Sequence, residues 1–186
     1  EICACLVGSE MCIRDRNYYS TNCPSDVFRS IYEEYSGKLR GSRKIDFEDM
    51  LCYTYELLTA RKDILSAWQS KFKYILIDEF QDINKIQYDT IRLLAQPENN
   101  LFIVGDDDQS IYGFRGSKPD IMLNFGNDYR NAGKVVLDVN YRSTPEIVKA
   151  AGDVIRFNNK RYKKNIRTDK QGGGAAVSYT HLRAHE

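Results

Sequence analysis

Two short apolar runs, each followed at once by acidic residues, stand out in the pattern of hydrophobic and polar positions. The first is the tetrapeptide at 74–77, which runs directly into Asp78 and Glu79, and the second covers 101–104 and precedes the acidic segment 105–109. Runs without a polar break suit strands that are buried on both faces of a parallel sheet. Ligands of open α/β sheets bind beyond the carboxyl ends of the strands, so the pattern predicts a ligand site at these acids.

A helix is predicted between the two runs. Asn84 followed by Gln87 is close to a capping box, which marks a helix start. The apolar residues after it keep to one helical face: Tyr88, Ile91, Leu94 and Ala95. Strand, helix and strand in this order form a βαβ unit, and they predict the α/β fold class with a parallel sheet.

Helices are also predicted on both sides of this unit. Apolar spacing indicates helices over 24–39 and 63–70, and Pro119 and Thr144 open two more. Asp46 is a credible N-cap for a helix whose buried stripe would be Phe47, Leu51, Tyr55 and Leu58. A further strand is predicted over 135–139.

Composition limits the classes of protein that this chain can belong to. The 186 residues are 42% hydrophobic with a net charge of +1, which suits one globular domain or parts of two. The near-neutral charge argues against a protein that is basic all over, so any DNA contact must follow a local track. No apolar run approaches the ~20 residues of a membrane-spanning helix, and no secretory leader is evident, so we expect a cytoplasmic protein with no membrane partner.

The strand-end side chains suit phosphate chemistry. Mg²⁺ is usually held by one or two carboxylates together with substrate phosphate oxygens, and Asp78 can supply such a contact. Glu79 can orient or deprotonate an attacking water, and Gln109 can reach a terminal phosphate or that water. The alternative for each acid alone is that it caps a helix or faces solvent, since turns favour Asp in any case.

Three ordered motifs resemble those of superfamily 1 DNA helicases of the UvrD/PcrA/Rep type. They are DEFQD at 78–82, VGDDDQSIYGFRG at 104–116 and LDVNYRST at 137–144. The resemblance extends over about 27–169. It implies an α/β, RecA-like P-loop NTPase fold, in which a parallel sheet is flanked by helices. The chain would be a partial domain of this fold that lacks the phosphate-loop strand.

The resemblance also implies roles for the strand-end residues, with ATP and Mg²⁺ as cofactors. Asp78 would coordinate Mg²⁺, while Glu79 would reach the ion through water and activate the attacking water. Gln109 would sense the γ-phosphate. Tyr141 would stack on the adenine, and Arg142 would reach the γ-phosphate from a second domain.

DNA contacts are implied for the glycine-punctuated segment 110–117. Tyr112 and Phe114 would lie on the DNA side with Arg115 beside them, and the partners would be single-stranded and duplex DNA. Aromatic faces bind bases without reading sequence. Many relatives carry Trp where this chain has Phe114, which leaves a smaller stacking face. Gly113 replaces a longer side chain found in some members.

The family order predicts five segments. They are a non-native tail (1–16), the end of a helical insertion (17–45), the C-terminal part of a first RecA-like domain (46–138), the start of a second (139–170) and another non-native tail (171–186). Both tails resemble translated sequencing-adapter read-through. The chain contains no Gly-x-x-x-x-Gly-Lys-Ser/Thr loop, so we expect it to be the middle of a longer enzyme that cannot hydrolyse ATP alone.

Two other functions are compatible with the sequence. The motifs are shared by helicase–nuclease subunits of the RecB/AddA type, which a nuclease domain farther along the gene would distinguish. The chain alone also fits a module that binds nucleotide or DNA without chemistry. The leading prediction is a segment of an ATP-dependent DNA helicase that moves along single strands from 3′ to 5′ in DNA repair or replication.

Overall fold

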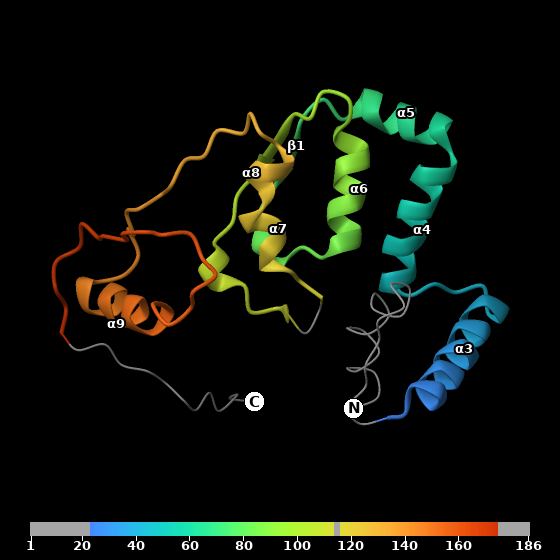
Figure 1. Ribbon diagram of the computed structural model, residues 1–186, viewed down its shortest axis with the longest axis horizontal. Helices are drawn as coiled ribbons and strands as arrows, with labels where there is room; N and C mark the ends of the chain where they lie inside the picture. Colours follow the sequence, from blue (N-terminus) through green and yellow to red (C-terminus); the bar gives the residue numbers. More distant parts are fainter. Residues whose placement is uncertain (1–22, 114–115, 175–186) are drawn as a thin grey trace. The chain divides into compact units, whose positions relative to one another are not determined.

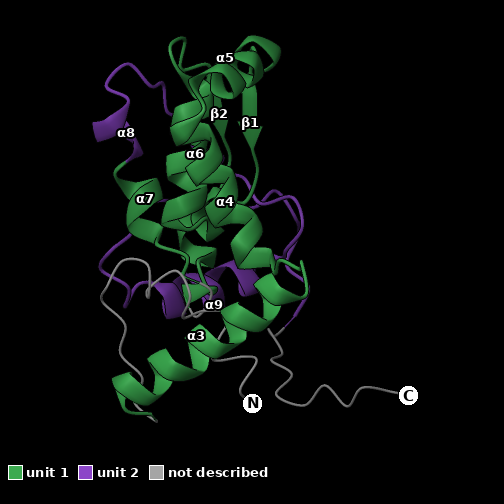
Figure 2. Ribbon diagram, turned by 90° about the vertical axis from the view of Figure 1, so that its right-hand side faces the viewer, with its two compact units in different colours: residues 1–124 green, residues 125–186 purple. Residues whose placement is uncertain are grey.

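The computed structural model describes residues 23–113 and 116–174 (Figure 1). The chain divides into two compact units, residues 1–124 and residues 125–186, coloured separately in Figure 2. The elements of the first unit are α3 (Ser25–Gly41), α4 (Phe47–Ala60), α5 (Lys62–Lys71), β1 (Ile75–Ile77), η1 (Phe80–Asp82), α6 (Lys85–Ala95), β2 (Leu101–Ile103), η2 (Asp107–Gln109) and α7 (Pro119–Leu123). Those of the second are α8 (Phe125–Asp128) and α9 (Pro145–Ile155).

A parallel pair of strands lies at the centre of the first unit. Strands β1 and β2 are hydrogen-bonded in parallel, with Ile75 opposite Leu101 and Ile77 opposite Ile103. Helix α6 connects them, so the predicted βαβ unit and the α/β fold class are confirmed. The more specific RecA-like assignment stays a prediction.

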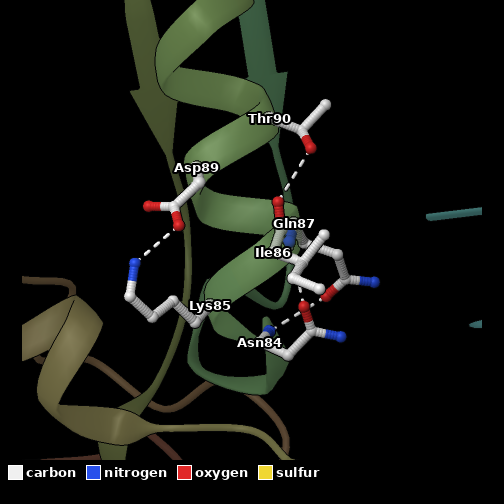
Figure 3. Close-up of polar contacts among 6 residues, drawn as sticks. All are labelled: Asn84, Lys85, Ile86, Gln87, Asp89 and Thr90. Carbon is white, nitrogen blue, oxygen red and sulfur yellow. Dashed lines mark hydrogen bonds and ion pairs between the residues drawn. The ribbon is translucent and has the colours of Figure 1, made fainter. Parts of the chain in front are cut away.

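Helix α6 begins where the sequence predicts it. The Asn84 side chain accepts a hydrogen bond from the Gln87 backbone N–H at 2.9 Å, and the Gln87 side chain accepts one from the Asn84 N–H at 3.0 Å (Figure 3). This reciprocal pair is the predicted capping box, and it satisfies two of the N–H groups that a helix start leaves open.

The core of the first unit forms where the helices meet η1. Figure 1 shows a layered order from β1 through α6 to α4, and α5 contacts both helices. The Phe80 ring meets the Tyr88 ring edge-on, with centroids 6.0 Å apart, a geometry that aromatic pairs prefer. The buried apolar residues are Phe28, Cys52, Leu58, Leu65, Phe80, Ile83, Tyr88 and Ala95.

The prediction that both strands are buried on two faces is wrong for the described structure. Leu76 is 71% exposed and Phe102, its partner across the pair, is 62% exposed. Their neighbours Ile75 and Ile77 are only partly exposed, so the exposure alternates along the strand. The physical reason is that α6 covers one face of the pair, and side chains alternate between the two faces.

The helix at Asp46 is confirmed, but its predicted stripe is only partly buried. The Asp46 side chain accepts a hydrogen bond from the Asp49 N–H at 2.7 Å and thereby caps α4. Leu58 is buried, whereas Phe47 is 82% exposed. Phe47 is the first residue of α4. Periodicity identifies the apolar face of a helix, but not how far along that face the neighbouring elements extend.

In the second unit, the helix predicted at Thr144 forms and the strand predicted over 135–139 does not. Helix α9 has Thr144 as its N-cap residue and a proline in its first turn, where proline is well tolerated. Among the described residues, the segment 135–139 contributes only one isolated bridge, between Val139 and Arg167. A strand needs partner N–H and C=O groups along its whole length, and this bridge supplies them at one position.

In the part of the chain that the structure describes, no helix has the length and apolar character needed to cross a membrane.

Candidate functional site

The two acidic strand ends lie side by side in the first unit. Beyond the strands, the Ile77 carbonyl accepts a hydrogen bond from the Val104 N–H at 2.8 Å. The Val104 carbonyl accepts one from the Phe80 N–H at 2.9 Å. Parallel pairing therefore places the segment that follows β1 beside the segment that follows β2. This is the edge at which open α/β sheets bind ligands.

Asp78 and Glu79 occupy a sharp turn after β1. Glu79 has φ 51° and ψ 41°. These angles lie in the left-handed region, which costs an L-residue about 1–2 kcal/mol. The Asp78 Oδ1 atom accepts a hydrogen bond from the Glu79 N–H at 2.9 Å, and both residues are exposed. The turn thus presents two neighbouring carboxylates to solvent from a strained backbone, a feature that often marks functional sites.

The Gln81 side chain forms hydrogen bonds with both strand ends. Its side chain is almost fully buried, at 2% exposure. Its Nε2 atom donates a hydrogen bond to the Glu79 Oε2 atom at 2.7 Å, and its Oε1 atom accepts one from the Asp106 N–H at 3.0 Å. Sequence reasoning missed this residue. Its position within the motif at 78–82 was the available signal, because burial of a glutamine cannot be read from its type.

Gly105 makes room for this glutamine. A Cβ atom built on Gly105 would lie 2.6 Å from the Gln81 Oε1 atom and 3.1 Å from the Phe80 backbone nitrogen. Both distances are too short for a methyl group beside a buried polar atom and a main-chain atom. The absence of a side chain at this position therefore permits the close approach of the two strand ends.

Gln109 is held by the same group of residues. The Asp106 Oδ2 atom accepts a hydrogen bond from the Gln109 Nε2 atom at 2.8 Å, and its Oδ1 atom accepts one from the Asp108 N–H at 3.1 Å. The Ser110 hydroxyl donates to the Gln81 carbonyl at 3.3 Å. The structure thus brings Asp78, Glu79 and Gln109 together at one edge of the strand pair.

Asp82 is a further acid beside this turn. Burial raises the pKa of Asp82 above its ordinary value, and the nearby Glu79 carboxylate raises the pKa further. The Oδ1 atom of Asp82 is buried and has no hydrogen-bond partner. Negative charge is therefore concentrated at this strand end, which favours an incoming cation.

The donor set at this edge fits Mg²⁺. Mg²⁺ keeps several waters and takes one or two carboxylates together with phosphate oxygens. An exposed strand-end carboxylate such as Asp78 can serve as such a ligand, and Glu79 lies beside it. Among residues 23–113 and 116–174, no group of three or more His, Cys, Asp or Glu side chains is placed to cage a metal ion. The arrangement suits an ion that arrives with a phosphorylated ligand.

Tyr141 and Arg142 lie in the second unit, on a turn that Asn140 holds. The Asn140 Oδ1 atom accepts hydrogen bonds from the Arg142 N–H at 2.9 Å and the Ser143 N–H at 2.8 Å. This is the local side-chain turn that Asn favours. Tyr141 and Arg142 are both exposed. The turn therefore presents an aromatic ring and a guanidinium group outward from adjacent positions.

The predicted DNA-side residues are only partly described. Tyr112 lies in the loop between η2 and α7 and is exposed. Phe114 and Arg115 lie outside the described residues, and so do the tail residues 1–16 and 175–186. The DNA-binding role of the three loop residues stays a prediction.

Comparison with known proteins gives the family. A family model described as the UvrD/REP helicase N-terminal domain matches residues 9–130. The chain belongs to this family. The matched segment contains the whole strand-end site of the first unit, so the resemblance predicted from the three motifs is confirmed for the UvrD/REP family.

Several UvrD/REP relatives are closely similar in sequence. ATP-dependent DNA helicase PcrA of Leuconostoc citreum is 41% identical over 166 residues, which cover 89% of this chain and 22% of the relative. DNA helicase II of Rickettsia typhi is 46% identical over 154 residues, which cover 82% of this chain and 23% of the relative. YjcD of Bacillus subtilis (strain 168) is 50% identical over 140 residues, which cover 75% of this chain and 18% of the relative. The chain thus spans about a fifth of the length of these relatives.

Proposed function

We propose that this chain is part of an ATP-dependent DNA helicase of the UvrD/PcrA type, with a RecA-like ATPase fold. The parent protein would move along single-stranded DNA from 3′ to 5′ and separate duplex DNA in repair or replication. Two findings support the proposal: the chain belongs to the UvrD/REP family, and proteins similar to it in sequence are named as DNA helicases.

The observation that carries the proposal is the pairing of the two acidic strand ends. Asp78 and Glu79 after β1 and Gln109 after β2 lie at one edge of a parallel strand pair. Hydrolysis of a nucleoside triphosphate needs a cation at the phosphates, a positioned water and a group that detects the terminal phosphate. These three side chains can meet those needs at one place.

In this proposal Asp78 holds Mg²⁺ together with phosphate oxygens of ATP. When bound, Mg²⁺ neutralises the charge of the phosphate oxygens. Glu79 would help to hold the ion through water, and its carboxylate would orient the attacking water and accept its proton. Gln109, held through its amide nitrogen by Asp106, directs its amide group toward the γ-phosphate.

The remaining roles fall to the second unit and the loop after η2. Tyr141 stacks on the adenine, and the Arg142 fork binds the γ-phosphate, since a planar guanidinium suits phosphate oxygens. Tyr112, Phe114 and Arg115 contact DNA through stacking and charge. We further propose that residues 46–138 belong to the first RecA-like domain and residues 139–170 to the second.

The first test is DNA-stimulated ATP hydrolysis by the full-length protein that carries this chain, beside its Glu79→Gln variant. Glutamine keeps the size of the side chain but cannot accept the proton. We expect kcat to fall by about 10²–10⁴-fold, the usual contribution of a general base. Single-stranded DNA should stimulate the wild-type protein.

Glu98→Gln is the matched control, because Glu98 is an exposed acid in the loop before β2. It should leave hydrolysis unchanged. A folded wild-type protein that binds single-stranded DNA but shows no hydrolysis would contradict the helicase proposal in favour of a binding module. The 186-residue chain alone is expected to show no turnover.

A further inference from the structure

We propose that Gln81 is a positioning residue that fixes Glu79 and the Gln109 turn relative to each other. The inference rests on the proposed function and deepens it, because it assigns to a buried side chain the alignment of the water-activating and phosphate-sensing groups. Gln81 itself does not face solvent, at 2% exposure.

The donor end of the Gln81 amide contacts Glu79. The Gln81 Nε2 atom lies 2.7 Å from the Glu79 Oε2 atom, a short donor–acceptor distance of the kind that hydrogen bonds to a carboxylate show. Glu79 is exposed, and its carboxylate accepts a hydrogen bond from the buried Gln81 amide. This buried donor is placed to set the direction of the Glu79 carboxylate.

The acceptor end of the Gln81 amide contacts the other strand end. The Gln81 Oε1 atom accepts from the Asp106 N–H at 3.0 Å, and the Asp106 carboxylate holds the Gln109 amide at 2.8 Å. Hydrogen bonds thus link Glu79 to Gln81 and Gln81 to the Asp106 backbone, and the Asp106 side chain binds Gln109. The Gln81 amide donates and accepts at once, so its two hydrogen bonds strengthen each other in a low-dielectric setting.

A buried amide needs hydrogen-bond partners at both ends in any case, so the identity of the partners carries the inference. The donor end meets the predicted site residue Glu79, and the acceptor end meets Asp106, which holds Gln109. Gly105 supports the fit, because a Cβ atom there would lie 2.6 Å from Gln81 Oε1. Gln81 is thus placed to align the two strand ends.

The test uses two variants of the full-length protein that separate the two contacts. Gln81→Met removes both hydrogen bonds at similar volume. Gln81→Glu keeps an acceptor for the Asp106 N–H but turns a carboxylate toward Glu79, so it removes only the contact with Glu79. We expect both variants to lose about 10- to 100-fold in kcat, as a misplacement of ~1 Å costs. The KM for ATP should change by less than about 3-fold, because ground-state binding is retained.

A second readout does not depend on turnover. Amide hydrogen exchange of the peptide that spans β2 and η2 reports the acceptor for the Asp106 N–H. Gln81→Met should speed exchange in this peptide at least about 10-fold, as expected when a hydrogen-bonded N–H loses its acceptor. Gln81→Glu should leave exchange close to that of the wild type. A loss of kcat in Gln81→Glu together with wild-type exchange would show that the contact with Glu79 matters for turnover separately from the contact with the Asp106 N–H.

Gln69→Met is the matched control. Gln69 is partly buried, and its Nε2 atom donates to the Leu93 carbonyl at 2.8 Å between α5 and α6. Its replacement should lower stability without changing kcat.

A double mutant gives a further test. Gln81→Met should have little further effect on single-turnover hydrolysis when Glu79 is already Gln, because the effects of residues that act as a unit are not additive.

Wild-type kcat in a folded Gln81→Glu protein would overturn the inference, as would an undiminished effect of Gln81→Met in the Glu79→Gln background. If Gln81→Met fails to fold, Gln81→Glu decides alone. A wild-type protein without DNA-stimulated hydrolysis would instead refute the proposed function, and the exchange measurement would still report whether Gln81 holds the Asp106 turn.

Discussion

At the scale of single residues, the site depends on one small residue and one buried amide. Sequence reasoning identified Asp78, Glu79 and Gln109, because acids and amides at strand ends are visible in the hydrophobic pattern. It could not identify Gln81, since the residue became notable only through its burial and its two contacts. The contact between Gln81 and Asp106 joins residues 25 positions apart in sequence, and it depends on the pairing of β1 with β2.

Gly105→Ala should therefore lower stability. The new methyl group would meet the Gln81 oxygen at 2.6 Å and the Phe80 nitrogen at 3.1 Å, and neither atom can move without breaking a hydrogen bond. Overpacking of this kind costs about 1–3 kcal/mol, measurable by chemical denaturation. Gly37→Ala is the control, and it should raise stability instead of lowering it. Gly37 lies within α3 with open space around it. Alanine there should stabilise the helix by about 0.5–1 kcal/mol. Equal effects of the two substitutions would contradict the close fit at Gly105.

At the scale of secondary-structure elements, local chemistry was predicted well and pairing was not. The caps at Asp46 and Asn84 were correct, because the groups that form a cap lie within four residues of one another. The strand over 135–139 was wrong because an apolar run does not show whether a partner strand is available. The two-sided burial of β1 was wrong for a similar reason, since burial depends on what covers each face.

The start of α4 gives a prediction about pH. Partial burial raises the pKa of Glu48 above its ordinary value, and the Asp46 carboxylate raises the pKa further. In the window above the ordinary glutamate pKa, the folded state then binds more protons than the unfolded state. Linkage requires the contribution of Glu48 to stability to fall as pH rises through this window. Glu48→Gln should remove this loss, as denaturation measured from about pH 4 to about pH 7 would show.

Asp46→Asn is the informative control for this effect. Asparagine is also a good N-cap, so the helix start is kept while the charge beside Glu48 is removed. The pH-dependent loss should become smaller but not vanish, because burial is the larger cause. An unchanged pH dependence in Glu48→Gln would rule out Glu48 as its source.

At the scale of the whole molecule, the predicted site residues are divided between two compact units. Asp78, Glu79, Gln109 and Tyr112 belong to the first unit, and Tyr141 and Arg142 belong to the second. The order of the motifs predicted the family, because order along the chain is a property of sequence. The sequence did not predict that the boundary between the two compact units lies after residue 124. That boundary depends on tertiary contacts, which no motif records.

The uncovered face of the strand pair is the main surface feature of the first unit. Leu76 and Phe102 are directly opposite each other and exposed. Tyr74 and Val104 are exposed too, and the alternation of side chains along a strand places them on the same face. Contiguous apolar surface of this kind binds hydrophobic dyes.

We therefore expect the 186-residue chain to bind the dye ANS. Leu76→Thr combined with Phe102→Thr should lower the bound fluorescence at least about 2-fold, because two exposed apolar side chains that lie opposite each other in the patch are lost. Ile45→Thr, at an exposed apolar residue away from the strands, is the control and should have little effect. Equal loss of fluorescence in the control would show that the dye binds elsewhere.

The left-handed backbone of Glu79 has a consequence for the history of such sites. A glycine at this position would relieve the turn, and an asparagine would tolerate it better than a glutamate does. Backbone preference alone would therefore replace Glu79, and under the proposed function the need for its carboxylate opposes that replacement. Under the same proposal, descendants that no longer use the chemistry should lose this residue early and gain stability as they do. The identity of residue 79 would then record whether a lineage still depends on the reaction.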